Sequence, residues 1–307
     1  MLFNRVLLTG ANGLLGQALV RRISQNREYD LLATSRGDSP RFREASGGYV
    51  PLDVTQPDDV AAVFEDFTPN VVVNCAAMSD VAACDEHRSE AWAVNARAVK
   101  TLAKQCRTHG ARLVQVSTDF VFNGKRGPYD EDARPDPVNY YGRTKLAGEN
   151  AVREAGRSNW ALVRTVLLYG TGHDLNRSNV VLWMIDQLSK GETLHIVDDQ
   201  YRTPTHVDDL ARGIDRLIHR EKTGIYHISG REMVSIYELA CTVAEVFGYD
   251  KSLIKPVSSD YFEDDVERPP RTGFIIRKAE TELDFDPRPL DEGLRDVQEQ
   301  LNRFSGP

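Results

Sequence analysis

The chain has 307 residues, of which 41% are apolar and 27% charged, a balance typical of folded globular proteins. Its net charge of −8 and the lack of any Lys/Arg run exclude the usual nucleic-acid and anionic-membrane binders. Four cysteines without CxxC spacing favour reduced thiols in a cytoplasmic protein over disulfides, and no acidic residues are spaced as a metal site. The N-terminus is typical of a strand rather than a signal peptide, and no apolar segment approaches the roughly 18 residues of a membrane span.

A glycine-rich turn follows the first predicted strand, Arg5–Thr9, and leads into a helix that ends near Ile23. Gly10, Gly13 and Gly16 have the spacing GxxGxxG, which permits a tight turn and leaves backbone N–H groups facing a phosphate pair. Such a triplet is a weak signal alone, but directly after a first strand it predicts a dinucleotide site. The residues that we assign to the cofactor in this turn are Gly10, Asn12, Gly13, Leu14 and Leu15.

The second predicted strand, Leu31–Thr34, ends in Ser35 and Arg36. Dinucleotide folds often have an acid at this place, which holds the ribose hydroxyls of the adenosine. A serine and an arginine suit a 2′-phosphate instead, so the sequence favours NADP(H) over NAD(H). The alternative is that Arg36 is only a solvated loop cation.

Two more strands are predicted at Tyr49–Leu52 and Val71–Cys75. After the first, Asp53 either accepts a hydrogen bond from the adenine amino group or caps the helix that follows. After the second, Ala76 and Ala77 are small enough to leave room for a cofactor at the carboxyl edge of the sheet, where ligands lie in open α/β folds.

A helix is predicted from about Ser89 to Arg107, with Asn95 inside its apolar pattern. A polar amide in such a place is either a satisfied core residue or a backbone anchor near an active site. From the sequence alone we favour the core residue.

The segment Gln115–Glu149 carries the predicted chemistry. A short strand ends in Ser117 and Thr118, and a later helix begins at Tyr140 or Tyr141 and places Tyr141 and Lys145 one turn apart on one face. A nearby ammonium stabilises a phenolate and lowers a phenol pKa of about 10, while a strand-end hydroxyl can bond to the oxygen that the phenol protonates. The segment therefore predicts polarisation of a carbonyl that a hydride donor reduces.

Strands alternate with helices as far as the predicted strand Ala161–Leu168, which calls for an α/β fold with a doubly wound parallel sheet of the Rossmann type. The alternation weakens afterwards. We expect helices at 179–190, 207–219, 236–247 with a capping box at Ser235 and Glu238, and 290–304, and strands at 194–197 and 224–230. We expect residues 1–170 to form a dinucleotide-binding domain to which 195–225 return, and 171–194 and 226–307 to form a smaller C-terminal substrate lobe.

GANGLLG, the YxxxK pair of Tyr141 and Lys145, and Asn95 resemble the extended short-chain dehydrogenase/reductase superfamily. Four longer strings are similar to dTDP-4-dehydrorhamnose reductases: NCAAMSDVAACDEHRSEAWAVNA, STDFVFNGKRGPYDEDARPDPVNYYGRTKLAGE, RTVLLYG and PTHVDDLA. The likeness runs from residue 5 to about 210. Beyond it, RPPRT at Arg268–Thr272 resembles an Arg-Pro element of the same family.

The resemblance implies hydride transfer from NADPH to the 4-keto carbon of a nucleotide-linked deoxysugar. It makes Tyr141 the general acid, Thr118 the partner of the substrate oxygen, and Lys145 the residue that binds the nicotinamide ribose and tunes Tyr141. Asn95 then becomes a structural support. The resemblance also places Asp53 and Val54 at the adenine, and Ala76 and Ala77 beside the ribose and nicotinamide.

On the substrate side, the resemblance implies roles for Met78, Asp119, Phe120, Leu167, Arg202 and Arg268. The family usually has Tyr at Phe120, Trp at Leu167 and a small residue at Arg202, so this chain departs from it where the sugar is recognised. We expect Arg202 to meet a phosphate or to be solvated, and Asp119 to cap a turn.

Two alternatives remain open. A sister nucleotide-sugar epimerase or dehydratase shares the fold. The triad is that of an ordinary reductase, and the absence of an additional acid at the Thr118-Asp119 pair argues against dehydration. A regulatory, cofactor-binding subunit like the β subunit of methionine adenosyltransferase resembles the same reductases, but the presence of Thr118, Tyr141 and Lys145 favours catalysis. A homodimer is expected on family grounds alone.

Overall fold

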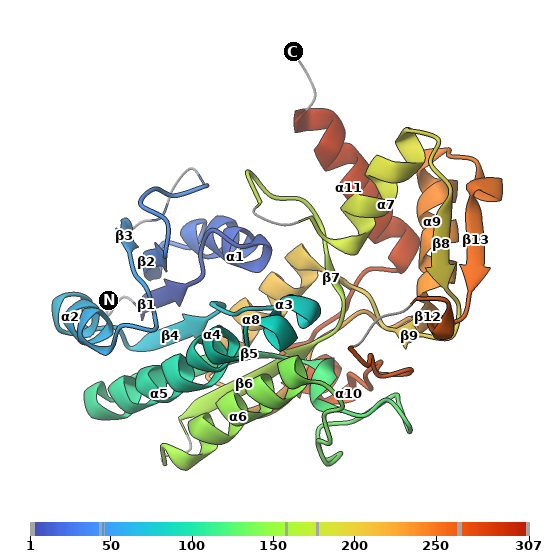
Figure 1. Cartoon of the computed structure of the whole chain (residues 1–307). Helices are drawn as coiled ribbons and strands as arrows, with labels where there is room; N and C mark the ends of the chain where they lie inside the picture. The colour runs from blue at the N-terminus through green and yellow to red at the C-terminus, as the bar shows by residue number, and fades with distance from the viewer. Residues whose placement is uncertain are drawn as a thin grey trace.

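The computed structural model describes residues 4–42, 45, 47–156, 159–175, 178–262 and 266–304. Its centre is a seven-stranded parallel sheet in the order β11-β6-β5-β4-β1-β2-β3 (Figure 1). The strands are β1 (Asn4–Thr9), β2 (Tyr29–Ser35), β3 (Tyr49–Pro51), β4 (Val71–Asn74), β5 (Arg112–Thr118), β6 (Trp160–Thr165) and β11 (Gly224–His227). The predicted doubly wound parallel sheet is confirmed.

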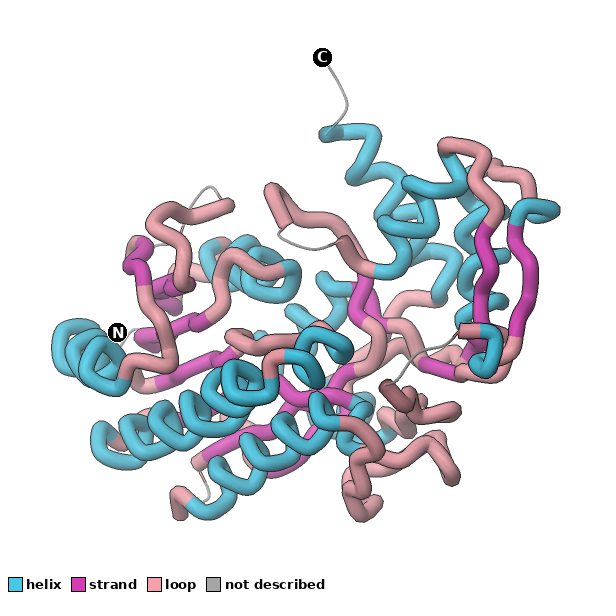
Figure 2. Tube along the Cα trace, viewed as in Figure 1, coloured by secondary structure: helices cyan, strands magenta, loops and turns pink. Residues whose placement is uncertain are grey.

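Helices cover both faces of this sheet, which is why the central strands are buried and carry apolar runs such as Val6–Leu8 and Val71–Val73 (Figure 2). One face packs against α2 (Pro57–Phe67), α5 (Ala98–His109) and α6 (Tyr140–Glu154). The other packs against α1 (Leu14–Ser24), α8 (Val207–His219) and α10 (Arg277–Leu283). The strand order reverses between β1 and β4, and ligands of open α/β sheets bind in the crevice at such a point.

A smaller layer lies beside the carboxyl edge of the sheet (Figure 1). It consists of α7 (Val180–Ser189), β8 (Leu194–Val197), α9 (Ile236–Phe247), β13 (Ile254–Val257) and α11 (Leu290–Phe304), which share one apolar core. Strand β8 pairs with β13 and so belongs to this layer. The division of the chain into a cofactor domain and a substrate lobe stays a prediction.

Short elements join the two parts. Strand β7 (Leu168–Tyr169) pairs with β10 (Thr205–His206), and β9 (Tyr201–Arg202) pairs with β12 (Val234–Ser235). Single turns of 3-10 helix lie at Asp119–Val121, Lys251–Leu253 and Ser259–Tyr261. No helix within the described ranges combines the length and apolarity that crossing a bilayer demands.

Two predicted elements are broken in the structure. The strand expected at Ala161–Leu168 ends at Thr165, because Leu167 has a left-handed backbone with φ of 37° that redirects the chain into β7. The helix expected from Ser89 to Arg107 is divided into α4 (Arg88–Trp92), a π-helical turn (Ala93–Arg97) and α5. The sequence patterns did not predict α3 (Val81–Glu86), α10 or β13, whereas the capping box of α9 is confirmed.

Candidate active site

The glycine turn after β1 lies directly against the end of β4. Gly10 has φ of +70°, and a Cβ built on it would lie 2.6 Å from the backbone nitrogen of Ala76. A Cβ on Gly16 would lie 2.3 Å from the Gly10 carbonyl oxygen. Gly13 is the N-cap of α1 and offers no side chain to its first N–H groups. The turn is therefore a cradle of backbone donors that suits a phosphate pair.

The other residues assigned to this turn have different surroundings. Leu15 is buried in the main core, which leaves only its backbone groups for a ligand, while Leu14 packs against that core and stays partly exposed. The amide of Asn12 donates to the Ser39 carbonyl over 3.0 Å and accepts from the Arg41 backbone N–H over 2.9 Å. Asn12 thus fixes the loop that follows β2.

This loop also contains Ser35 and Arg36. The Ser35 hydroxyl lies 2.8 Å from the hydroxyl of Tyr49, which also donates to the Gly37 carbonyl. Arg36 extends from the held loop with 68% of its side chain exposed, and its Nη1 lies 3.5 Å from Oε1 of Glu90 on α4. The sequence did not point to Glu90.

At the end of β3, the Asp53 Oδ1 accepts bonds from the backbone N–H and the hydroxyl of Thr55, over 2.9 and 2.7 Å. The N-cap of α2 is Gln56, so the expectation that Asp53 caps this helix is wrong. Val54 is a buried core residue. At the end of β4, Ala76 is half-buried beside the glycine turn and Ala77 is exposed.

Helix α6 begins against the end of β5. Its N-cap, Asn139, accepts a 2.9 Å hydrogen bond from the Gly142 N–H through its side chain. A Cβ on Gly142 would lie 2.1 Å from the Phe120 carbonyl oxygen, so only glycine permits this approach. The contact places the ring of Tyr141 edge-to-face with that of Phe120, with centroids 5.8 Å apart.

The other two members of the predicted catalytic set lie at the same end of β5. The Lys145 ammonium donates to the Val116 carbonyl over 2.9 Å. Thr118 ends the strand, where its hydroxyl accepts from the Phe120 N–H over 3.2 Å and donates to Oδ1 of Asp119 over 3.1 Å. The structure therefore brings Thr118, Tyr141 and Lys145 to one strand end.

The electrostatics of Lys145 follow from its burial. Only 6% of the residue is exposed, and this desolvation lowers the pKa of the ammonium from 10.5 to about 8. Glu149, one turn further along α6, opposes the shift. Lys145 thus remains a cation at neutral pH but titrates well within the range where enzymes are assayed.

Asn95 anchors the backbone after β4. Its Oδ1 accepts from the Met78 N–H over 3.0 Å, and its Nδ2 donates to the Met78 carbonyl over 2.9 Å and to the Thr144 hydroxyl over 3.0 Å. It lies in the π-helical turn, a feature frequent at functional sites. Asn95 is 1% exposed and its amide is fully bonded, so the satisfied core residue that we favour is confirmed, and the same bonds anchor the Met78 backbone.

Asp119 and Arg202 form a buried ion pair beside Thr118. Their side chains are 4% and 3% exposed, and the Arg202 Nε lies 3.8 Å from the Asp119 Oδ2. The Thr272 hydroxyl donates to the same carboxylate. Burial raises the pKa of Asp119, and the Arg202 guanidinium opposes that rise. Asp119 is not the turn cap that we expected, because Thr118 caps the 3-10 turn.

Arg202 is not solvated either, so that expectation is also wrong. Its Nη1 donates to the carbonyls of Tyr201 and Pro270 over 2.7 and 3.3 Å, and its Nη2 donates to Gln200 over 3.2 Å. Protein oxygens therefore already engage the guanidinium, which leaves it poorly placed to bind a phosphate. It holds together the strand β9, the loop at Pro270 and the end of β5.

The remaining substrate-side residues surround this pair. The ring of Phe120 contacts both the ring of Tyr141 and the guanidinium of Arg202, whose Cζ lies 5.6 Å from the Phe120 centroid. Arg268 is half-buried and close enough to Arg202 to lower the pKa of that residue, together with the larger effect of burial. Leu167 packs where the main core meets the core of the smaller layer.

The sequence does not predict a buried polar network beneath α6. The Glu149 carboxylate accepts two bonds from Arg164, over 2.8 and 2.7 Å, and one each from Ser117 and Arg153. Burial raises the pKa of Glu149, but these donors hold it below its usual value. The sequence does contain a signal for this carboxylate: Glu149 follows Lys145 by four residues, a spacing that places both side chains on the same face of the helix.

A separate polar group lies near the start of α8, where His206, Asp208 and Asp296 converge. Each acid already has a cationic partner: Asp208 pairs with Arg21 over 3.0 Å, and Asp296 with Arg288 over 2.8 Å. The protein itself thus compensates the charge of this group.

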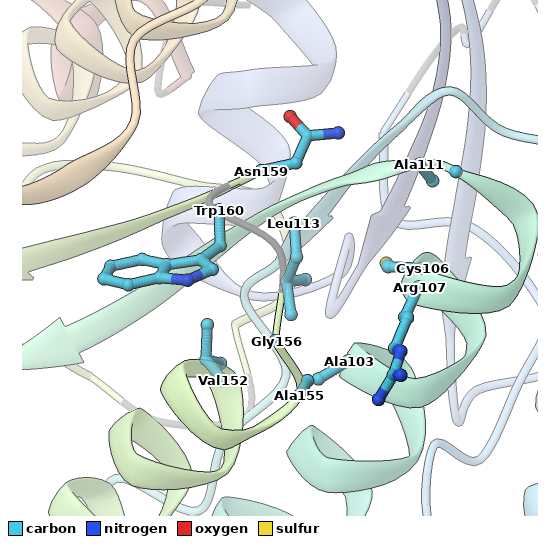
Figure 3. Close-up of a pocket in the computed structure, with 11 residues that line it drawn as sticks. Ala103, Cys106, Arg107, Ala111, Leu113, Val152, Ala155, Gly156, Asn159 and Trp160 are labelled. Carbon is cyan, nitrogen blue, oxygen red and sulfur yellow. The ribbon is translucent and has the colours of Figure 1, made fainter.

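A small cavity lies at the opposite, amino end of β5 and β6 (Figure 3). Its volume of about 30 Å³ is lined mainly by apolar groups, among them Cys106, Val152 and Trp160. A space of this size holds about one water molecule, so it is no substrate site. A larger hollow of about 680 Å³ lies over the loop from Asn123 to Asp136.

Comparisons with known proteins identify relatives of this chain. The family model described as RmlD substrate binding domain matches residues 4–303. A dTDP-4-keto-6-deoxy-D-glucose reductase of Streptomyces niveus is 36% identical over 258 residues, which cover 84% of this chain and 83% of that protein. The methionine adenosyltransferase 2 subunit beta of Bos taurus is 34% identical over 260 residues, which cover 83% and 75%. The crystal structure of dTDP-4-dehydrorhamnose reductase from Bacillus anthracis in complex with NADP has a TM-score of 0.86 and 32% identity, covering 97% of this chain and 99% of that one.

Proposed function

The chain belongs to the RmlD substrate binding domain family, and on this premise we propose that it is an oxidoreductase that uses a nicotinamide dinucleotide. The glycine cradle suits the cofactor, and the related reductase from Bacillus anthracis was crystallised with NADP. We further propose that it reduces the 4-keto group of a nucleotide-linked deoxysugar. The observation that carries this proposal is the convergence of Thr118, Tyr141 and Lys145 at the end of β5.

The roles of these side chains follow from their chemistry. A bound reduced nicotinamide supplies the hydride. As the carbonyl carbon accepts that hydride, Tyr141 gives its phenolic proton to the carbonyl oxygen, which becomes the product hydroxyl. Thr118 holds this oxygen by a hydrogen bond once its hydroxyl proton turns from Asp119 Oδ1, to which it donates in the free chain, to the substrate. The Lys145 ammonium stabilises the phenolate that Tyr141 leaves behind. The half-buried ring of Phe120 excludes water from one side of the phenol.

The pH dependence should report on Lys145. We expect kcat to fall as the pH rises through about 8, where the buried ammonium loses its proton. The titration of Lys145 does not itself destabilise the fold over this range. The native pKa lies below the unfolded value, so the unfolded state binds more protons between about pH 8 and 10.5, and this group makes folding more favourable as the pH rises. Initial rates from pH 6 to 10 test the expectation, and a flat profile would contradict it.

We also propose a preference for NADPH, supported by the exposed Arg36 at the end of β2. The variant Arg36→Ala should weaken NADPH binding about tenfold and leave NADH binding nearly unchanged, because a charge-assisted bond to the 2′-phosphate is lost. Titration of both cofactors measures the two dissociation constants. Arg27→Ala, an exposed arginine at the other end of β2, is the matched control. Equal weakening of both cofactors would show that Arg36 takes no part in the preference.

A second candidate function is a cofactor-binding subunit without turnover. It is supported by the 34% identity to the methionine adenosyltransferase 2 subunit beta. The purified protein, mixed with NADPH and a panel of nucleotide 4-keto sugars, separates the two: loss of NADPH absorbance with one sugar supports the reductase. Tight NADPH binding without oxidation by any sugar favours the subunit. Product analysis in the same assay distinguishes reduction from epimerisation or dehydration.

A further inference from the structure

The ion pair between Arg36 and Glu90 joins two sides of the cofactor edge. Arg36 follows β2, while Glu90 lies on α4, in the segment that follows β4. Strand β1, with its glycine turn, separates β2 from β4 in the sheet. The pair therefore spans the edge of the sheet at the place where the adenosine end of a dinucleotide would lie.

The backbone beneath Arg36 is fixed, but the ion pair is not. Asn12 holds the loop at Ser39 and at Arg41, and Tyr49 holds it at Gly37. Both charged side chains, in contrast, remain largely in solvent, with 68% of Arg36 and 55% of Glu90 exposed. A pair of this kind contributes little to folding and exchanges its partner readily. A phosphate at the loop would thus meet an arginine whose backbone is held in place and whose guanidinium already has a carboxylate beside it.

We propose that Glu90 competes with the 2′-phosphate of NADPH for Arg36, so that the charge at position 90 sets how strongly the chain prefers NADPH over NADH. The inference rests on the proposed cofactor function and adds a residue from α4 to it. A 2′-phosphate must replace the carboxylate at the guanidinium and then remain near an anion of like charge, and both effects weaken its binding. NADH carries no phosphate at this position, so its affinity should be insensitive to Glu90.

Two substitutions test the proposal by equilibrium titration of the full chain with NADPH and with NADH. Glu90→Gln keeps the size and removes the charge, and should tighten NADPH binding about threefold at low salt. Glu90→Lys adds a second cation and should tighten it about tenfold or more. NADH affinity should change by less than about twofold in both, and the gain for NADPH should shrink at high salt. Glu86→Gln is the matched control, because this exposed acid lies on the preceding helix without a contact to Arg36.

The outcomes distinguish failure of the role of Glu90 from failure of the proposed cofactor function. Unchanged NADPH affinity in both variants, or equal changes for NADPH and NADH, would overturn the role of Glu90 and leave the proposed cofactor intact. Failure of the unmodified chain to bind either cofactor would overturn the proposed function and this inference together. A change confined to NADPH, absent in Glu86→Gln, would support the inference.

Discussion

Replacing Tyr141 with Phe is expected to lower kcat by about 100-fold or more while NADPH binding persists. The substitution removes only the phenolic hydroxyl and keeps the ring, whose edge-to-face contact with Phe120 at 5.8 Å does not need the oxygen. The proton for the carbonyl oxygen must then come from water, which is not held in position. NADPH oxidation with the accepted nucleotide sugar gives kcat, and titration gives the cofactor affinity.

The neighbouring residue supplies a matched control. Tyr140 carries the same hydroxyl on the same helical turn, but it donates to the Arg88 carbonyl over 3.2 Å, on the side of α4. Tyr140→Phe should retain kcat within about twofold. A near-normal rate for Tyr141→Phe, or an equal loss in both variants, would show that Tyr141 is not the acid.

The largest expected loss of stability comes from Glu149→Gln, at about 3–5 kcal/mol of unfolding free energy. Glu149 is fully buried and neutralises Arg164, which is only 1% exposed, so the variant leaves a guanidinium in the core without its counter-ion. Denaturant unfolding measures the change. Glu154→Gln, an exposed acid on the same helix, should change stability by no more than about 0.5 kcal/mol.

The pH dependence of unfolding gives a second readout of the same carboxylate. Its native pKa lies below the usual value of 4.5, so its contribution to stability is complete above that pH and is lost as the pH falls through the native pKa. The variant should lack this part of the acid slope. A loss below about 1 kcal/mol, together with an unchanged slope, would show that Arg164 does not depend on Glu149.

Local signals predicted the framework of the molecule. The parallel sheet follows from apolar runs such as Val71–Val73, since strands covered on both faces have no polar side. The glycine spacing at Gly10 and the four-residue spacing of Tyr141 and Lys145 report backbone geometry that a few neighbouring residues decide. Features of this kind are visible in one stretch of sequence.

Features that depend on distant partners were not predictable. Arg202 is a buried ion-pair partner only because the end of β5 presents Asp119 to it, and no pattern around Arg202 reveals that contact. Likewise, Asn95 is an anchor because Met78 and Thr144 approach it from two other segments. The strand predicted through Leu168 is interrupted at Leu167, where the chain leaves the central sheet for the pair of β7 and β10. A continuous apolar run in the sequence gives no sign of that change of sheet.

The loop that carries Arg268 is tied down at three points. The Asn139 side chain donates to the Glu267 carbonyl over 2.9 Å, Arg202 donates to the Pro270 carbonyl, and Thr272 donates to Asp119. To swing away, the segment would have to break its hydrogen bond with the Asn139 cap and its two hydrogen bonds with the buried Asp119–Arg202 pair. The segment is consequently ordered in the free chain, and under the proposed function a nucleotide-sugar substrate would lose little conformational entropy by contacting it.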